Sequence, residues 1–208
     1  MVTSLGMVAP AAAGILVLLG SFPGSNAQGY AIDTRENILT SARTLAYDLM
    51  TYYKGNQSGG IPGLLPGPPP AGDYYWWQGG ALMGAYIDYW HLTGDASYNQ
   101  VVTQGMLHQT GPFDDYLPLN WTASMGNDDQ CFWALSAMSA AESEFPNPAE
   151  GKPQWLALAK NVFETQALRI QGETGCNGGL RWQIPFANLG YDFKNSVWAH
   201  DCEQTRTC

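Results

Sequence analysis

Two adjacent carboxylates, Asp128 and Asp129, are the side chains of this 208-residue sequence whose type and spacing best fit catalysis. Two acids this close do not both ionise easily, so one would keep its proton while the other acts as a base or nucleophile. A structural explanation competes with this one. At a helix start, Asn127 or Asp128 would cap free backbone N–H groups, and the helix dipole favours negative charge there.

Glycoside hydrolysis is one reaction that uses such a pair. One carboxyl group protonates the leaving oxygen while the other attacks the sugar or activates water, at about 5 Å separation for retention and roughly 6.5–9.5 Å for inversion. Neighbouring residues at a helix start diverge by about 100° around the axis, which permits the shorter separation. The 8 Trp and 11 Tyr would suit a site that stacks on sugar rings, and they would equally suit an aromatic core.

A second chemistry with paired acids is the Mg²⁺-dependent activation of prenyl diphosphates by all-α enzymes. That class needs a third acid in a DDxxD pattern, and Phe132 stands at that position here. No Cys/His spacing indicates zinc, so we predict neither a metal nor a cofactor. The histidines lack a partner nucleophile or a metal-ligand spacing, and we assign no role to His91, His108 and His200.

Apolar periodicity predicts five helices, at residues 33–52, 76–92, 96–110, 127–145 and 153–171. The first would begin with a capping box of Asp33 and Glu36. Its apolar stripe would consist of Ile38, Ala42, Leu45, Leu49 and Tyr52. The second and fourth helices are apolar or small on nearly every face, which predicts that they are interior, whereas their neighbours are amphipathic. Inner and outer helices therefore alternate, as in an α/α toroid.

Alternation also predicts where the acids lie. If successive helices reverse direction, the inner ones are parallel and their N-termini open on one rim. That rim would collect the long loops at 54–73 and 111–126 and the segment 172–191, which contains a strand-like stretch, Leu180–Ile184. The opposite rim would receive the short turn at Gly94. Long loops on a rigid scaffold favour function at the first rim.

Three segments in order, within residues 30–196, resemble the fungal members of glycoside hydrolase family 76. They are Tyr74-Tyr75-Trp76-Trp77-Gln78-Gly79-Gly80-Ala81, Gly126-Asn127-Asp128-Asp129-Gln130, and Cys176-Asn177-Gly178-Gly179-Leu180-Arg181-Trp182-Gln183-Ile184 with Tyr191-Asp192-Phe193-Lys194-Asn195-Ser196. The resemblance implies an endo-α-1,6-mannanase-like cell-wall protein with an (α/α)6 fold. It also implies a retaining mechanism, with Asp128 as nucleophile and Asp129 as acid/base. Some fungal members are thought to be transglycosidases, so water need not be the acceptor.

Other residues are candidates for the site and for modification. Sugar stacking is predicted for Trp76, Trp77, Trp121, Trp133 and Trp182, of which about half would be core residues instead. Gln78 and Asn127 would orient hydroxyl groups or serve as caps. Asn56 and Asn120 lie in glycosylation sequons, and Cys131 would form a disulfide bond with Cys176.

Export and a sugar partner are consistent with the rest of the sequence. Residues 1–27 carry an apolar run too short to span a bilayer and a small-x-small motif, which predicts a signal peptide and a secreted or cell-wall location, with no stable membrane span. A net charge of −9 argues against nucleic acid as a partner. The expected partner is mannan or another mannose-containing glycan.

The resemblance stops near Ser196, with five of the expected twelve helices present. Residues 28–196 would form the N-terminal half of the domain, and residues 197–208 a divergent tail. Half a toroid would expose apolar surface on its inner helices, which predicts self-association and leaves activity of this fragment in question. The alternative is a non-catalytic glycan-binding or wall-structural fragment that uses only the aromatic residues.

Overall fold

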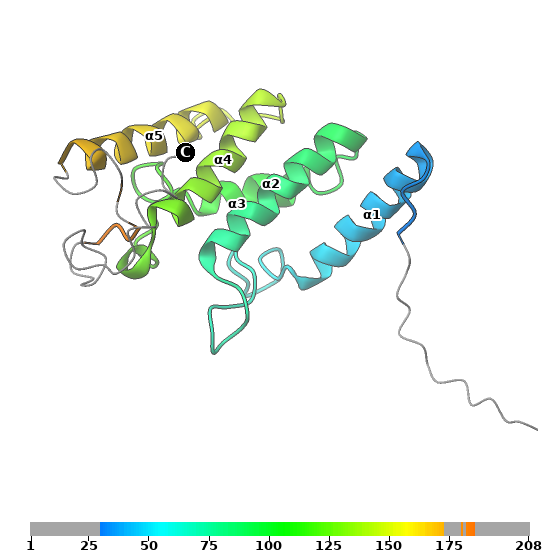
Figure 1. The fold of residues 1–208 in the computed structure, drawn as a ribbon, viewed down its shortest axis with the longest axis horizontal. Helices are drawn as coiled ribbons and strands as arrows, with labels where there is room; N and C mark the ends of the chain where they lie inside the picture. Colours follow the sequence, from blue (N-terminus) through cyan, green and yellow to red (C-terminus); the bar gives the residue numbers. More distant parts are fainter. Residues whose placement is uncertain (1–29, 173–179, 181, 186–208) are drawn as a thin grey trace, which may run out of the picture.

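The computed structural model describes residues 30–172, 180 and 182–185. The described chain is all-α, as predicted, and no strand occurs within it (Figure 1). Its elements are α1 (Arg35–Tyr52), α2 (Trp76–Thr93), α3 (Asn99–His108), the 3-10 turn η1 (Thr122–Ser124), α4 (Asn127–Glu142) and α5 (Trp155–Gly172). The predicted leader at 1–27 and tail at 197–208 lie outside the described residues.

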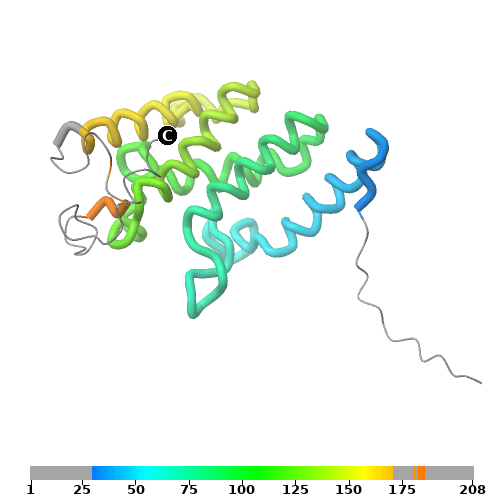
Figure 2. The backbone as a smooth tube through the Cα atoms, viewed as in Figure 1, coloured from blue at the N-terminus to red at the C-terminus, as the bar shows by residue number. Residues whose placement is uncertain are grey.

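The helices form an open arc. Figure 2 shows α1, α2, α4 and α5 following one another with their axes in similar directions. The helices predicted to be interior, α2 and α4, pack extensively on each other, while α3 covers α2 and α5 covers α4. Contacts of α1 with α2 are fewer. This alternation is the predicted incomplete toroid, with five α-helices in the described part of the chain.

Trp133 forms the centre of the core. Its ring is fully buried and lies 5.2 Å from the ring of Trp76 and 5.6 Å from that of Tyr116. Close packing of α2 on this ring requires glycine, because a Cβ at Gly80 would stand 2.9 Å from the indole. Ser136 fixes the same crossing by donating its hydroxyl to the Gly80 carbonyl oxygen at 2.9 Å.

Helix starts differ from the sequence prediction where side chains bond locally. The Asp33/Glu36 capping box is wrong, because Thr34 is the N-cap and its hydroxyl accepts from the Asn37 N–H at 3.1 Å. Similarly, the third helix begins at Asn99 rather than residue 96. The Asp95 carboxylate holds the preceding residues in a turn by accepting from the Ser97 N–H and hydroxyl.

Two apolar faces remain open in the described chain. The stripe predicted for the first helix is largely exposed, and the residues that α1 buries are Ser41 and Ala46. The expectation that the fourth helix is buried on all sides is also wrong. On α4, Phe132 is 38% and Leu135 is 52% exposed. Their face also carries Asp128, so the acid lies on the open side of an interior helix.

Candidate active site

A cleft of about 510 Å³ lies at the rim where α2 and α4 begin. The two long loops and the segment after α5 contribute to its walls, as predicted for this rim. The lining residues are Pro68, Pro69, Tyr75, Trp76, Trp77, Trp121, Ser124, Met125, Asp129, Trp182 and Gln183. The cleft therefore combines aromatic rings with one member of the acidic pair.

The start of α4 orients the two acids differently. The N-cap is Gly126, so the prediction that Asn127 or Asp128 caps this helix is wrong. Asp129 serves the helix start instead, since its Oδ2 accepts from the Gly126 N–H at 2.7 Å. Asp128 is exposed and its Oδ1 accepts from the Asp129 N–H at 2.9 Å. Asp129 therefore has a structural role at the helix start, while the exposed Asp128 remains accessible for chemistry.

The segment after α5 pairs with the residues before α4. The Asn127 N–H donates to the Trp182 carbonyl oxygen at 2.8 Å, and the Ile184 N–H donates to that of Met125 at 2.9 Å. Between these bonds lies one antiparallel bridge, from Gly126 to Gln183. The stretch predicted to be strand-like thus makes a single bridge within its described residues. This pairing brings the Trp182 indole N–H to 3.0 and 3.1 Å from the Asp128 carboxylate oxygens.

Electrostatics separate the two acids. Burial raises the pKa of Asp129 to about 6, against the opposing effect of the Gly126 N–H, and the nearby Asp128 charge adds to the rise. Asp129 therefore holds its proton in mildly acidic solution. Asp128 lies in a more exposed position and accepts two N–H groups. The arrangement provides a proton donor next to a hydrogen-bonded carboxylate.

A buried polar network lies beneath the pair. Asn127 is 2% exposed, and its Oδ1 accepts from Arg169 Nη1, which also donates to Gln130 Oε1 at 2.9 Å. Gln166 Nε2 donates to the Asn127 carbonyl oxygen at 2.8 Å. Burial lowers the pKa of Arg169 to about 10, and the attraction of Asp115 opposes this shift. The network joins α5 to the first turn of α4.

Several predicted site residues therefore serve the fold. Asn127 faces α5, and Gln78 accepts from the Tyr75 N–H at 2.7 Å as a cap of α2. Trp133 is a core residue with no exposed surface. Trp76 lines the cleft but is 7% exposed and donates to Gln109 Oε1 at 2.8 Å. The remaining predicted stacking residues, Trp77, Trp121 and Trp182, line the cleft with greater exposure.

Phe132 and Arg169 are two residues of this region that sequence reasoning did not assign to the site. Phe132 packs on Trp77 with ring centroids 4.5 Å apart, one turn along α4 from Asp128. Its spacing of four residues from Asp128 placed it on the same face and could have identified it. Nothing in the sequence pattern distinguishes Arg169 from an exposed basic residue, and the contact with Asn127 reveals its partly buried position.

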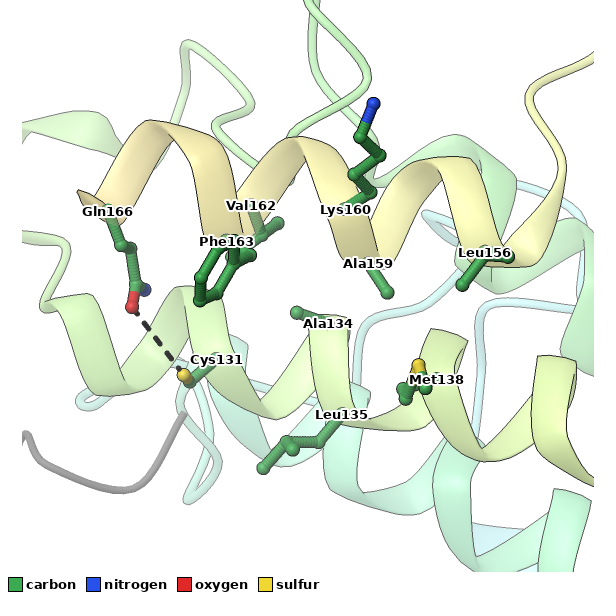
Figure 3. A pocket seen from close by; sticks show the side chains of 10 residues that line it. All are labelled: Cys131, Ala134, Leu135, Met138, Leu156, Ala159, Lys160, Val162, Phe163 and Gln166. Atoms are coloured by element: carbon green, nitrogen blue, oxygen red, sulfur yellow. Dashed lines mark hydrogen bonds between the residues drawn. The ribbon is translucent and has the colours of Figure 1, made fainter. Parts of the chain in front are cut away.

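A second hollow, of about 280 Å³, lies between α4 and α5 and lacks acidic groups (Figure 3). Apart from Lys160 and Gln166, apolar and Cys side chains line it. Cys131 is disulfide-bonded, and its Sγ lies 3.8 Å from Gln166 Oε1. The other three cysteines lie outside the described residues, so the pairing with Cys176 stays a prediction.

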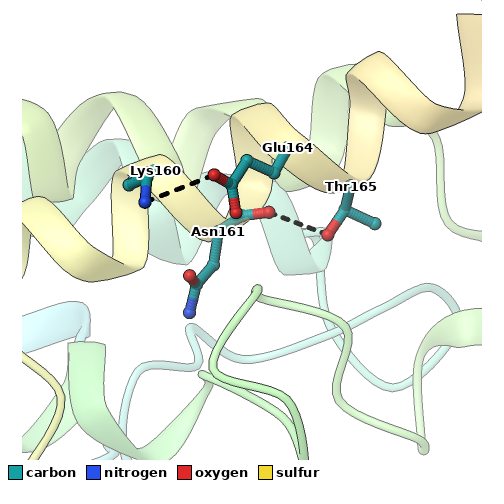
Figure 4. Close-up of polar contacts among 4 residues, drawn as sticks. All are labelled: Lys160, Asn161, Glu164 and Thr165. Atoms are coloured by element: carbon teal, nitrogen blue, oxygen red, sulfur yellow. Dashed lines mark hydrogen bonds and ion pairs between the residues drawn. The ribbon is translucent and has the colours of Figure 1, made fainter.

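Polar groups on α5 also make contacts outside the hollow (Figure 4). Lys160 and Glu164 form an exposed ion pair at 3.3 Å, and the Thr165 hydroxyl donates to the Asn161 carbonyl oxygen at 2.8 Å. The Asn161 side chain donates to the Asp114 carbonyl oxygen at 3.1 Å. The contact between Asn161 and Asp114 ties α5 to the loop before α4.

Both predicted glycosylation sites, Asn56 and Asn120, are exposed on the loops at the rim of the cleft. Within residues 30–172, 180 and 182–185, no group of three or more His, Cys, Asp or Glu side chains could hold a metal ion. In the same part of the chain, no helix is long and apolar enough to cross a membrane.

Known proteins resemble this chain along most of its length. A profile described as glycosyl hydrolase family 76 matches residues 37–201. The protein named mannan endo-1,6-alpha-mannosidase DCW1 of Saccharomyces cerevisiae is 45% identical over 184 residues, which are 88% of this chain and 40% of that protein. Mannan endo-1,6-alpha-mannosidase DFG5 of the same yeast is 36% identical over 179 residues, 86% of this chain and 38% of the relative.

A solved structure agrees with these relatives. The crystal structure of Dfg5 from Chaetomium thermophilum in complex with glucosamine matches with a TM-score of 0.75 and 67% sequence identity. The match covers 79% of this chain and 40% of that one. The chain thus spans about two fifths of the length of these relatives.

Proposed function

The chain belongs to glycosyl hydrolase family 76, and from that membership we propose that it is part of a retaining enzyme that cleaves or transfers α-1,6-linked mannan. The observation that carries this proposal is the acidic pair, in which burial raises the pKa of the cleft-lining Asp129 to about 6 beside the hydrogen-bonded Asp128. Retaining glycosidases use two carboxyl groups whose environments separate their pKa values, one as acid/base and the other as nucleophile.

In the proposed mechanism, Asp128 attacks the anomeric carbon as the bond to the leaving oxygen breaks. Asp129 gives its proton to that oxygen, so the reducing-end fragment leaves as a neutral alcohol. The resulting carboxylate of Asp129 then takes a proton from water or from a sugar hydroxyl. That acceptor attacks the same carbon and releases Asp128, and two inversions give net retention. Hydrolysis and transfer differ only in the acceptor.

Aromatic side chains support a sugar substrate. Trp77 and Trp121, both partly exposed, line the cleft that contains Asp129. Flat rings bind the C–H faces of pyranoses, and a neutral glycan suits a protein with a net charge of −9. The relatives are named for their action on mannan, and we propose the same polymer, or a mannose-containing anchor glycan, for this protein.

We place this activity outside the cell or in the cell wall. The predicted signal peptide at 1–27 and the exposed sequons at Asn56 and Asn120 agree with export. The relatives named DCW1 and DFG5 act on mannan, which supports the same location.

The test is to incubate the protein with an α-1,6-mannooligosaccharide and to follow the anomeric configuration of the products by ¹H NMR. We expect the products to retain the α configuration. We expect Asp128→Ala and Asp129→Ala each to reduce the rate at least 10²-fold, in line with removal of a positioned acid or base. Asp73→Asn, which alters an exposed acid on the rim loop outside the cleft lining, is the matched control. Unchanged rates in both alanine variants would exclude the proposed reaction.

A non-catalytic glycan-binding fragment is the competing function. The open face of α4, with Phe132 against Trp77, favours it because rings that are exposed can bind sugar without the acids. The variant with both Asp128→Asn and Asp129→Asn discriminates between the two. If the double variant still binds mannan and the unaltered chain does not turn it over, the non-catalytic function is supported.

A further inference from the structure

We propose that Trp182 is a positioning residue, whose indole N–H holds the Asp128 carboxylate in the orientation for attack instead of stacking on the substrate. The inference rests on the proposed function of Asp128. Trp182 Nε1 lies 3.0 Å from Oδ1 and 3.1 Å from Oδ2. Together with the Asp129 N–H, which donates to Oδ1 at 2.9 Å, this shared donor restricts the orientation of the carboxylate at the helix start.

The donor belongs to the scaffold that starts α4. The Trp182 carbonyl oxygen accepts from the Asn127 N–H at 2.8 Å, and Gln183 bridges to Gly126. Two residues further on, the Ile184 N–H donates to the Met125 carbonyl oxygen at 2.9 Å. The indole is therefore attached to a backbone that pairs with the start of α4 from Trp182 to Ile184, which ties its position to that of Asp128.

The helix start leaves room for this contact through a glycine. A Cβ at Gly126 would stand 2.1 Å from Asp128 Oδ1 and 2.9 Å from Trp182 Nε1. Any side chain at residue 126 would force the carboxylate and the indole to move. The absence of a side chain at this residue is thus part of the arrangement, which provides a second way to test it.

An indole is also the right kind of donor for a nucleophile. A neutral N–H orients a carboxylate without the full charge of Lys or Arg, which would hold the anion more strongly and oppose attack on the sugar. Asp129 is bound separately, through the Gly126 N–H at 2.7 Å. Each acid of the pair therefore has its own N–H partner.

Heteronuclear NMR of the 208-residue chain tests the contact without any turnover. Trp182→Phe identifies the indole resonance of Trp182 among those of the 8 Trp residues. We expect that resonance to move upfield in Asp128→Ala, since the donor loses a charged acceptor. Glu142→Ala, which removes an exposed carboxylate at the far end of α4, should leave it in place. A resonance unmoved by Asp128→Ala would overturn the inference.

Kinetics then separate positioning from stacking. Trp182→Phe keeps an aromatic ring and removes the donor, so we expect kcat to fall about tenfold while KM changes less than about twofold. Gly126→Ala should cause a comparable loss with Trp182 in place. A raised KM at unchanged kcat would instead make Trp182 a stacking residue. If the unaltered chain turns over no mannan while the indole shift is observed, the proposed function fails and the Trp182–Asp128 contact does not.

Discussion

At Asp129, burial and a backbone hydrogen bond act in opposite directions on one carboxyl group. Burial is the larger effect and raises its pKa to about 6, while the Gly126 N–H favours the anion. A proton donor for a glycosidic oxygen must be protonated at the working pH, and a pKa near 6 meets this need in a mildly acidic medium. We expect kcat/KM on mannan to decline as the pH rises above about 6.

The same pKa makes Asp129 a source of instability at neutral pH. A carboxyl group that ionises near pH 4 when unfolded and near 6 when folded binds more protons in the native state between these values, so stability falls as the pH rises through this window. Asp129→Asn keeps an acceptor for Gly126 and removes the charge. We expect it to be more stable than the unaltered chain by about 1 kcal/mol at pH 7.5, after allowance for solvent screening.

Urea unfolding at pH 4 and pH 7.5 measures that difference. At pH 4 the advantage of Asp129→Asn should be largely absent, because Asp129 is then protonated in the folded state. The same measurements on Asp73→Asn give the baseline for an exposed rim acid. If Asp129→Asn were more stable than the unaltered chain by the same amount at both pH values, ionisation of Asp129 would not be the cause of the difference.

Among the elements, α5 supports the acidic pair through contacts with the buried side of the first turn of α4. Its last turns bring Arg169 and Gln166 onto the first turn of α4, where Arg169 donates to Asn127 and Gln130. The guanidinium is partly buried, so its bonds are poorly replaced by water. Because Asn127 directly precedes Asp128, a displacement of α5 would reach the acidic pair through one residue.

Removal of this link tests its contribution. Arg169→Met keeps much of the side-chain volume but removes the guanidinium bonds to Asn127 and Gln130, and we expect a loss of roughly 1–3 kcal/mol in the free energy of unfolding. Lys160→Met on the same helix removes an exposed ion pair with Glu164 and should cost less than about 0.5 kcal/mol. Similar losses for both variants would argue that Arg169 contributes no more than a surface charge.

Sequence periodicity predicted the existence and order of the helices because apolar spacing reflects packing directly. It failed at α1, where the apolar stripe is mostly exposed, because periodicity identifies an apolar face without naming what covers it. It also failed at the start of α4. There Gly126, which lacks a capping side chain, is the N-cap, and Asp129 reaches back to its N–H.

The candidate site was predictable in part for similar reasons. The acids and the rim followed from the motif and the alternation of helices, whereas Trp133 and Trp182 differ only in burial, which composition does not encode. One became the centre of the core and the other a partner of Asp128. Arg169 was missed because a charged residue in an amphipathic pattern is usually solvated, whereas here it donates to Asn127 and Gln130 on the neighbouring helix.

At the scale of the whole molecule, the arc has two apolar edges. The outer stripe of α1 lies at one edge, and the hollow between α4 and α5 lies at the other. Phe163 and Leu156, which line the hollow, are 64% and 58% exposed. Exposed apolar surface of this kind favours association. We expect the 208-residue chain, expressed alone, to self-associate.

Light scattering after size exclusion measures this association. The double variant Leu156→Lys and Phe163→Lys should shift the chain toward the monomer, since two charges would lie in an apolar contact. Glu142→Lys, which changes the charge on an exposed site outside the hollow, should not. A chain that remains monomeric at high micromolar concentration without any substitution would contradict the expectation.

One part of the cleft wall, formed by Pro68, Pro69, Tyr75 and Trp76, offers few free hydrogen-bond donors. Pro68 and Pro69 have no N–H, and the Tyr75 N–H and the Trp76 indole already donate to Gln78 and Gln109. Along this part of the wall, sugar hydroxyls therefore have to act as donors themselves or remain hydrated. Such a surface holds a sugar by its C–H faces and depends little on the orientation of individual hydroxyl groups, so a repeating polymer could bind there in several registers with similar affinity.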